Sequence, residues 1–325
     1  MKLTLGTYTK HSSKGIYQIN LNTDTKRLEK LTLLAEIQNA TYIAVDRNRL
    51  YAIVKDGGSG LRMYEDGRIV NQVTHEETPS CFVSCVPAKE IVMTANYHGG
   101  HIDLYSTQER KLRHLQRITY PEGSHAHCIE YVPRFNEVIV CDLGLDKVLA
   151  YSINDLQLVL KDTFYALPKQ GPRHFTVHPV LPIIYVMTEL SCEVLVLKRS
   201  EGAFELIQTL STLPEGEDQI KSGSAIRISP DGKFLYVSNR GHDSITAFEI
   251  KTEGKLSFIQ NISTFGKNPR DFNLSPDGRF VVVANLSSDS LTLFERDMEK
   301  GTITLLEKDV QAPEVTCILF DQQIE

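Results

Sequence analysis

The amino-acid sequence predicts an all-β fold, a seven-bladed β-propeller with four antiparallel strands in each blade. Three observations carry this prediction: a repeat of 42 to 51 residues, four short strands within each repeat, and two chain ends that each hold only part of a repeat. Repeats of this length with four strands per unit are typical of propeller blades. The sequence shows no domain boundary, so we expect residues 1–325 to form a single propeller domain.

The repeat is marked by short apolar strands whose last residues recur at a regular spacing. The clearest copies read FLYVSN from residue 234 and FVVVAN from residue 280. The last residues of the equivalent strands are Val54, Asn96, Asp142, Thr188, Asn239 and Asn285. About six residues after most of these markers another alternating strand begins. Each unit is therefore expected to have the same internal layout.

One repeat shows all four strands of a unit. It reads SAIRIS from residue 224, KFLYVS from 233, ITAFEI from 245 and LSFIQNIS from 256. The polar turns PDGK and TEGK join the strands in hairpins, as Asp-Gly and Gly-containing turns commonly do. Residues 152–161 could form a helix, but their place in the repeat favours a strand, a turn and a second strand.

The two ends of the chain complement each other. LTLGT from residue 3 and IYQIN from residue 16 represent the later part of a unit, and VTCILF from residue 315 represents a first strand. Together they complete one further period. We therefore expect the last strand to pair beside the first strands in a composite seventh blade that leaves no open sheet edge.

Composition excludes several classes of partner. The chain is 41% hydrophobic and 23% charged, with a formal net charge of −6, so neither nucleic acid nor an anionic membrane is an expected partner. Without a secretory leader or a run of eighteen apolar residues, the protein is expected to be soluble and cytoplasmic. Its six cysteines lack CxxC spacing, so we expect reduced thiols, no metal and no cofactor.

The turns of an up-and-down blade divide between two faces, because successive strands alternate in direction. The PDGK and PDGR turns at 230–233 and 276–279 lie on one face and are explained by backbone geometry. The opposite face is expected to carry segments rich in His, Arg and Glu beyond what a turn requires. These are SHAH (124–127), GPRH (171–174), NPRD (268–271), NYHGG (96–100), DLGLD (142–146), TELSC (188–192) and NRGHDS (239–244).

The repeat register brings charged residues to two equivalent positions on this face. The position where the innermost strand begins is occupied by Cys81, His127, Arg173, Ser224 and Arg270. The position after each marker residue is occupied by Tyr97, Leu143, Glu189, Arg240 and Leu286. An imidazole, a carboxylate and three guanidiniums at one channel mouth suit an anionic small molecule, because a guanidinium is always charged and matches carboxylate or phosphate. His127 and Glu189 are the candidates for proton transfer near neutral pH.

Structural alternatives exist for each of these residues. Arg173 and Arg270 could bond to a neighbouring blade, and Glu189 could neutralise an arginine. The same loops and strand starts supply further substrate-binding candidates, namely Asn96, His98, His174 and Asn239. His98, His174 and His242 also suit supporting or solvent-facing positions.

In this order and over essentially the whole chain, the motifs SHAHCIE, CDLGLDKV, GPRHFTVHP and SNRGHDSI resemble the lactonase family of seven-bladed propellers. That family includes the cycloisomerase type of bacterial 6-phosphogluconolactonase and fungal carboxy-muconate lactonizing enzymes. The resemblance implies hydrolysis of 6-phospho-D-glucono-1,5-lactone in the pentose phosphate pathway, a part of glucose metabolism. It assigns catalytic roles to His127, Arg173, Glu189 and Arg240, with Arg270 as a neighbouring anion contact, and either His127 or Glu189 would activate water.

The sequence departs from the family pattern at several positions. Val54 and Lys55 stand where many relatives carry Asn-Glu, and Ser224 and Arg227 stand where other branches carry an acidic residue and a His. Two alternatives therefore remain: a lactonizing cycloisomerase or another sugar-lactone hydrolase on the same site, and a non-catalytic propeller that binds a partner on one face.

Overall fold

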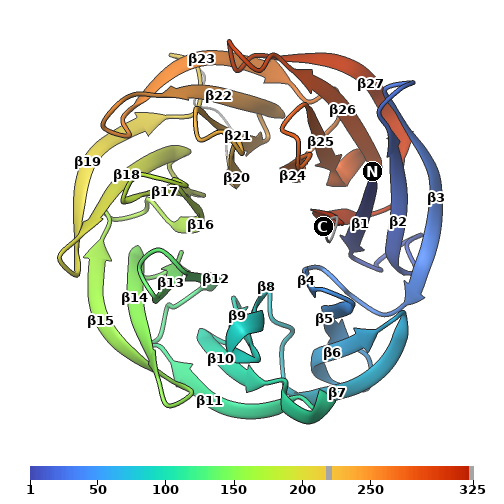
Figure 1. Cartoon of the computed structure of the whole chain (residues 1–325), viewed down its shortest axis with the longest axis vertical. Helices are drawn as coiled ribbons and strands as arrows, with labels where there is room; N and C mark the ends of the chain where they lie inside the picture. The colour runs from blue at the N-terminus through green and yellow to red at the C-terminus, as the bar shows by residue number, and fades with distance from the viewer. Residues whose placement is uncertain (217–221, 322–325) are drawn as a thin grey trace. The chain divides into compact units, whose positions relative to one another are not determined.

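A computed structural model describes residues 1–216 and 222–321 of the chain. The described residues form 28 strands, arranged in seven four-stranded sheets (Figure 1), and three short 3-10 turns, η1 (Pro87–Lys89), η2 (Gln108–Arg110) and η3 (Leu286–Ser288). Pairing within the sheets is antiparallel wherever its register is described. Seven successive four-stranded sheets of this kind are the blades of a seven-bladed β-propeller, so the predicted fold class is confirmed. No described helical segment is long and apolar enough to cross a membrane.

The chain divides into two compact units, which are described separately. Unit 1 holds Met1–Leu5, Gln18–Thr32 and the described residues from Pro172 to Asp321, and unit 2 holds Gly6–Tyr17 and Leu33–Gly171. The prediction that the whole chain forms one domain stays a prediction.

Unit 2 contains three sheets of strands that are consecutive in the chain. Its first sheet is β4 (Ile43–Asp46), β5 (Arg49–Lys55), β6 (Ser59–Glu65) and β7 (Arg68–Glu76). The second is β8 (Phe82–Val86), β9 (Ile91–Asn96), β10 (His101–Ser106) and β11 (Arg113–Thr119). The third is β12 (Ala126–Val132), β13 (Glu137–Asp142), β14 (Lys147–Asn154) and β15 (Gln157–Tyr165). The strand-turn-strand prediction for residues 152–161 is therefore confirmed.

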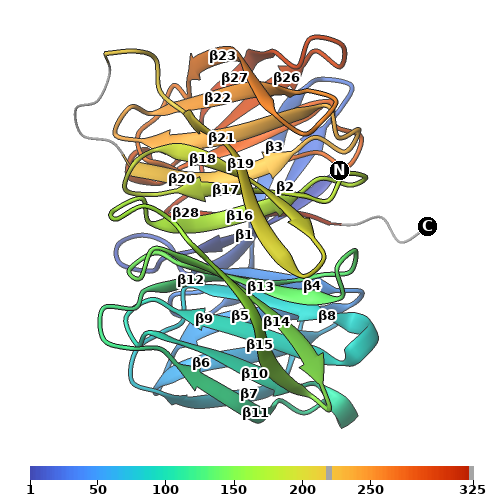
Figure 2. The same cartoon turned by 90° about the vertical axis from the view of Figure 1, so that its left-hand side faces the viewer.

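Unit 1 contains three further consecutive sheets. The first is β16 (Pro172–Val177), β17 (Ile183–Thr188), β18 (Glu193–Ser200) and β19 (Ala203–Ser211). The second is β20 (Ser222–Ile228), β21 (Phe234–Arg240), β22 (Ser244–Ile250) and β23 (Leu256–Ser263). The third is β24 (Pro269–Leu274), β25 (Phe280–Asn285), β26 (Ser290–Arg296) and β27 (Ile303–Gln311). Both views show β20 to β23 side by side in chain order (Figures 1 and 2).

The seventh sheet combines both ends of the chain, as the sequence predicts. Its strand order is β28 (Val315–Phe320), β1 (Lys2–Thr7), β2 (Gly15–Asn22) and β3 (Arg27–Glu36). Asp321 bonds β28 to the first strands. Its N–H donates to the Lys2 carbonyl at 2.9 Å. Its carboxylate accepts from Thr4 Oγ1 at 2.9 Å and from Gln18 Nε2 at 3.3 Å. The last strand thus covers the edge that β1 would otherwise expose.

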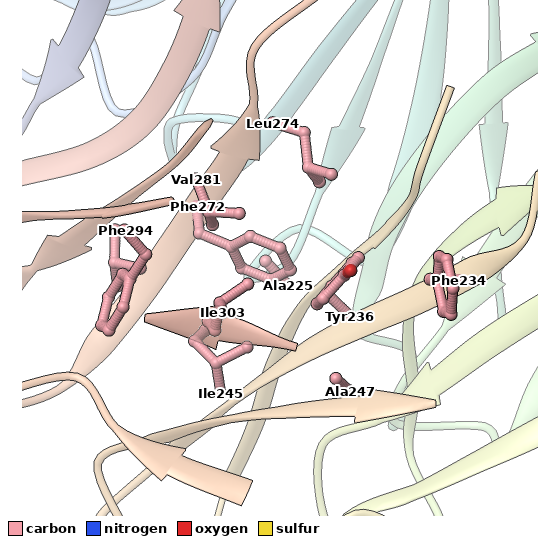
Figure 3. Packing of buried hydrophobic residues seen from close by; sticks show 11 residues of the cluster. Ala225, Phe234, Tyr236, Ile245, Ala247, Phe272, Leu274, Val281, Phe294 and Ile303 are labelled. Atoms are coloured by element: carbon pink, nitrogen blue, oxygen red, sulfur yellow. The ribbon is translucent and has the colours of Figure 1, made fainter. Parts of the chain in front are cut away.

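The cores of both units lie between neighbouring sheets. In unit 1 the side chains of Ala225, Tyr236 and Phe272, from β20, β21 and β24, are all 0% exposed and belong to one cluster (Figure 3). Every residue of β25 is buried, whereas all residues of the outer strand β27 after Ile303 are half-buried or exposed. Strands covered on both faces read as continuous apolar runs, which explains the FVVVAN pattern in the sequence.

The PDGK and PDGR turns owe their sequence to local geometry. Gly232 and Gly278 have φ values of +70° and +71°, a region that favours glycine. The Asp231 and Asp277 carboxylates each accept a hydrogen bond at 3.1 Å from the backbone N–H two residues later. These turns are structural, as predicted.

The role of β28 gives a first testable prediction. A chain that ends after Glu314 lacks β28 and exposes the paired edge of β1, so we expect it to aggregate or to lose its cooperative thermal unfolding. A control chain that ends after Asp321 keeps every contact of Asp321 and should unfold within about 2 °C of the full chain. Equal melting temperatures for the two truncations would show that β28 does not stabilise the composite sheet.

Candidate functional site

The predicted site residues belong to two groups, one in each unit. Arg173, Glu189, Arg240 and Arg270 lie in unit 1, together with His174 and Asn239. Asn96, His98 and His127 lie in unit 2. Each group is considered by itself.

The predicted strand register is confirmed within each unit. Arg173 and Arg270 are the second residues of β16 and β24, and Ser224 is near the start of β20. His127 is likewise the second residue of β12, and Cys81 directly precedes β8. In unit 1, β20 lies beside both β16 and β24, so these strand starts are neighbours in space.

Two guanidiniums converge on a single oxygen of Glu189, which follows β17. Arg173 Nε donates to Glu189 Oε2 at 2.9 Å, and Arg240 Nη2 lies 2.8 Å from the same oxygen. The side chains of Arg173 and Arg240 are 3% and 15% exposed, and that of Glu189 is 19% exposed. Within the described part of the chain, no hydrogen bond or ion pair occupies Glu189 Oε1. We call Arg173, Glu189, Arg240 and Arg270 the arginine cluster.

The start of β20 holds both arginines in place. Arg173 Nη1 donates to the Ser224 carbonyl at 2.9 Å. Arg240 Nη2 donates to Ser222 Oγ at 2.6 Å and to the Gly223 carbonyl at 2.9 Å. Ser224 Oγ in turn donates to the Arg270 carbonyl at 2.6 Å. These hydrogen bonds fix the guanidiniums relative to three strands of unit 1.

Gly223 is required by a close approach of two backbones. Its N–H donates to the Glu189 carbonyl at 2.9 Å. A Cβ atom at Gly223 would lie 2.3 Å from the Thr188 carbonyl oxygen and 2.3 Å from Met187 Cε. Our sequence analysis missed Ser222 and Gly223 as supports of the cluster. The available signal was a glycine inside a strand, which commonly marks such an approach.

The arginine cluster contains three guanidiniums and one carboxylate, and the guanidiniums of Arg173 and Arg240 share that carboxylate. Burial lowers the pKa of Arg240, Glu189 opposes that shift, and the positive charge of Arg270 adds to it. The neighbouring Asp271 is paired with Arg227 Nη2 at 2.8 Å, accepts the Ile318 N–H at 2.9 Å and also interacts electrostatically with Arg173. Guanidiniums gathered in this way suit the binding of an anion.

Arg240 also presents a hydrogen-bond donor that the described residues leave unused. Its Nε is buried and has no hydrogen-bond partner among them. A buried donor without a partner is costly, so such groups often mark the place of a ligand or a water molecule. Arg240 is thus suited to binding a ligand, whereas the almost completely buried Arg173 is suited to holding Glu189 in position.

In unit 2, His127 belongs to an aromatic group around Tyr97. The His127 ring, in a residue only 5% exposed, meets the Tyr97 ring edge-on with centroids 5.9 Å apart. His125 is stacked on Tyr97 at 4.2 Å, and His98 meets Tyr97 edge-on at 5.1 Å. The Asp142 carboxylate fixes this loop by accepting the His125 N–H at 3.0 Å. Tyr97 therefore contacts three imidazoles, a feature that the sequence did not reveal.

Asn239 and Asn96 are bonded to the segments that connect their sheets to the preceding ones. Asn239 donates to the Thr212 carbonyl at 3.2 Å and accepts from Thr212 Oγ1 at 2.6 Å, and Asn96 donates to the Thr78 carbonyl at 2.8 Å. His174 is 3% exposed, and its ring nitrogens lie 3.3 Å from Arg173 Nη1. His98 is exposed. Substrate contacts by these residues stay predictions.

Fold and site together define a β-propeller with a buried, positively charged cluster at the strand ends of unit 1. Residues 2–320 match the sequence profile of the family described as "Lactonase, 7-bladed beta-propeller", and the chain belongs to this family. It is 38% identical to the 6-phosphogluconolactonase of Bacillus subtilis over 98% of both chains.

Solved structures agree with this assignment. A crystal structure of a protein from Lactobacillus plantarum superposes with a TM-score of 0.96 at 36% identity, covering 99% of each chain. The periplasmic gluconolactonase of Pseudomonas aeruginosa superposes with a TM-score of 0.88 at 25% identity, covering 98% of each chain.

The shared oxygen of Glu189 gives the second prediction. Glu189→Gln removes the counter-charge of two arginines, one of them nearly inaccessible, and we expect a loss of about 3 kcal/mol in the free energy of unfolding, measured in urea. Glu295→Gln is the matched control, because Glu295 forms an ion pair with Lys26 at a more exposed position. The side chains of Glu295 and Lys26 are 34% and 41% exposed. That variant should lose less than about 1 kcal/mol. Similar losses in both variants would contradict a structural role for the Glu189 contacts.

Proposed function

We propose that this protein hydrolyses a sugar lactone, and that its substrate is 6-phospho-D-glucono-1,5-lactone, converted to 6-phosphogluconate as in the pentose phosphate pathway. The observation that carries this proposal is the convergence of Arg173 and Arg240 on one oxygen of Glu189, with the positive charge of Arg270 acting on Arg240. A phosphorylated sugar acid lactone supplies the anion that such a cluster favours.

Lactone hydrolysis needs few groups. Water must attack the ring carbonyl, the carbonyl oxygen must be stabilised as it becomes an oxyanion, and the substrate must be held in line. We assign anion binding to Arg240, whose buried Nε has no hydrogen-bond partner among the described residues. Arg270, which adds positive charge beside Arg240, would contribute a second contact. Arg173 would act through Glu189 by holding its carboxylate.

Two residues are candidates for the general base. Glu189 Oε2 is held by two guanidiniums, so Oε1 is the oxygen that would accept a proton from water. His127 is the alternative from the sequence, and its part in the same reaction stays a prediction. A pH profile separates the two: loss of the base should abolish the ascending limb of kcat, whereas loss of a positioning group should lower kcat at every pH.

A second candidate substrate is the plain sugar lactone. The Pseudomonas aeruginosa relative is named a gluconolactonase, and the Bacillus subtilis relative a 6-phosphogluconolactonase. The gathering of three guanidiniums in the arginine cluster supports the phosphorylated substrate. A charge-assisted guanidinium contact to phosphate contributes roughly 1.5–3 kcal/mol, which corresponds to a factor of about 10 to 150 in kcat/KM.

The third prediction tests the activity and the substrate class together. Purified protein should accelerate the loss of 6-phosphogluconolactone above the rate in buffer, with kcat/KM at least about 10-fold higher than for gluconolactone. A lactonizing cycloisomerase would instead be active only on muconate-type substrates. A protein that only binds a partner would accelerate none of the lactones in the panel, and either result would overturn the proposal.

The fourth prediction separates the anion contact from general effects of charge. Arg240→Lys keeps the charge but loses the planar fork and Nε, so kcat/KM for the phosphorylated lactone should fall at least about 10-fold. Arg279→Lys, in an exposed turn of the same unit, should leave kcat/KM within about twofold of wild type. Equal effects of the two substitutions would exclude Arg240 as a substrate ligand.

A further inference from the structure

A group of histidines surrounds a buried carboxylate in unit 2 and shares no residue with the arginine cluster. His75 comes from β7, Asp103 from β10 and His114 from β11. Each of these residues offers one ligand atom, and the three atoms lie within 4.8 Å of one another. Two imidazole nitrogens and one carboxylate oxygen at this spacing are a common ligand set for divalent transition metals.

Hydrogen bonds hold Asp103 in place within this group. Its carboxylate, 0% exposed, accepts hydrogen bonds from Arg117 Nε at 2.8 Å and Nη2 at 2.7 Å, and its Oδ1 lies 2.7 Å from His114 Nε2. Asp103 therefore presents an oriented carboxylate oxygen, as a metal ligand must.

The two imidazoles approach Asp103 from the solvent side. His75 and His114 are exposed, and their ring centroids are 5.0 Å apart. His75 Nε2 lies 3.5 Å from the Tyr105 hydroxyl. An outer partner of this kind commonly orients a metal-binding histidine. The group thus has a route for an ion to enter and a partner that orients one of its exposed histidines.

We propose that His75, Asp103 and His114 bind a divalent transition-metal ion, with Zn²⁺ as the best match. Mg²⁺ and Ca²⁺ prefer sets made entirely of oxygen ligands. The ion takes the place of the hydrogen bond between His114 Nε2 and Asp103 Oδ1, and the proton on that nitrogen moves to Nδ1 or to solvent. Water completes the coordination. Arg117 stays bonded to Asp103, and its positive charge keeps the affinity below that of a closed structural zinc site.

A metal ion at this position would join two sheets. His75 belongs to the sheet β4–β7, whereas Asp103 and His114 belong to the sheet β8–β11. The two sheets already share a buried cluster that includes Leu61 and Tyr105. The Leu112 N–H adds a hydrogen bond to Asn71 Oδ1 at 2.9 Å. The ion would therefore link two neighbouring sheets, and its binding to the folded state would stabilise that state by mass action.

The test is thermal unfolding of the chelator-treated full chain with added metal. Excess Zn²⁺ should raise the melting temperature by about 5 °C, and the same concentration of Mg²⁺ should not. Co²⁺ should produce a visible absorption band that His75→Gln abolishes. His75→Gln and His114→Gln should also lose the Zn²⁺-dependent rise, whereas the control His11→Gln should keep it.

Because His75 is exposed, His75→Gln is expected to fold and to unfold at the melting temperature of the metal-free wild type. The proposal is overturned if Zn²⁺ fails to raise the melting temperature of wild type, or raises that of His75→Gln equally. It is independent of the lactonase proposal, since a metal-induced shift in melting temperature needs no substrate.

Discussion

The packing of one sheet against the next is the constraint on which the rest of the structure depends. It buries the middle strands on both faces, so that all of β25 is inaccessible to solvent. The charged residues of the arginine cluster lie at the ends of strands. Arg173 and Arg270 begin β16 and β24, Arg240 ends β21, and Glu189 follows β17.

The position of the arginine cluster at strand ends explains how it is both buried and polar. Guanidiniums at strand ends lose hydration to the neighbouring sheets, and backbone carbonyls such as those of Gly223 and Ser224 replace part of it. Burial of Arg240, with Arg270 as a second positive charge, disfavours its charged form, and Glu189 opposes that effect. A bound anion would act in the same direction as Glu189.

The sequence predicted the blades because their signal is local. The strand pattern, the hairpin turns and the composite sheet all follow from periodicity along the chain, and the equivalent positions of Arg173, Ser224 and Arg270 follow from the same register. Which guanidinium holds Glu189 and which one keeps a donor for a ligand could not be predicted in this way. That distinction depends on a close backbone approach at Gly223 and on contacts between strands of different sheets.

The histidine group around Asp103 could not be predicted from the sequence for the same reason. His75, Asp103 and His114 have no metal-binding spacing in the chain, and only the packing of the sheets brings them together. The carboxylates of Glu189 and Asp103 differ in their partners. Glu189 shares one oxygen between two guanidiniums. Asp103 lies beside one guanidinium and the imidazole of His114. Imidazole nitrogens with a carboxylate oxygen suit a metal cation, whereas gathered guanidiniums suit an anion.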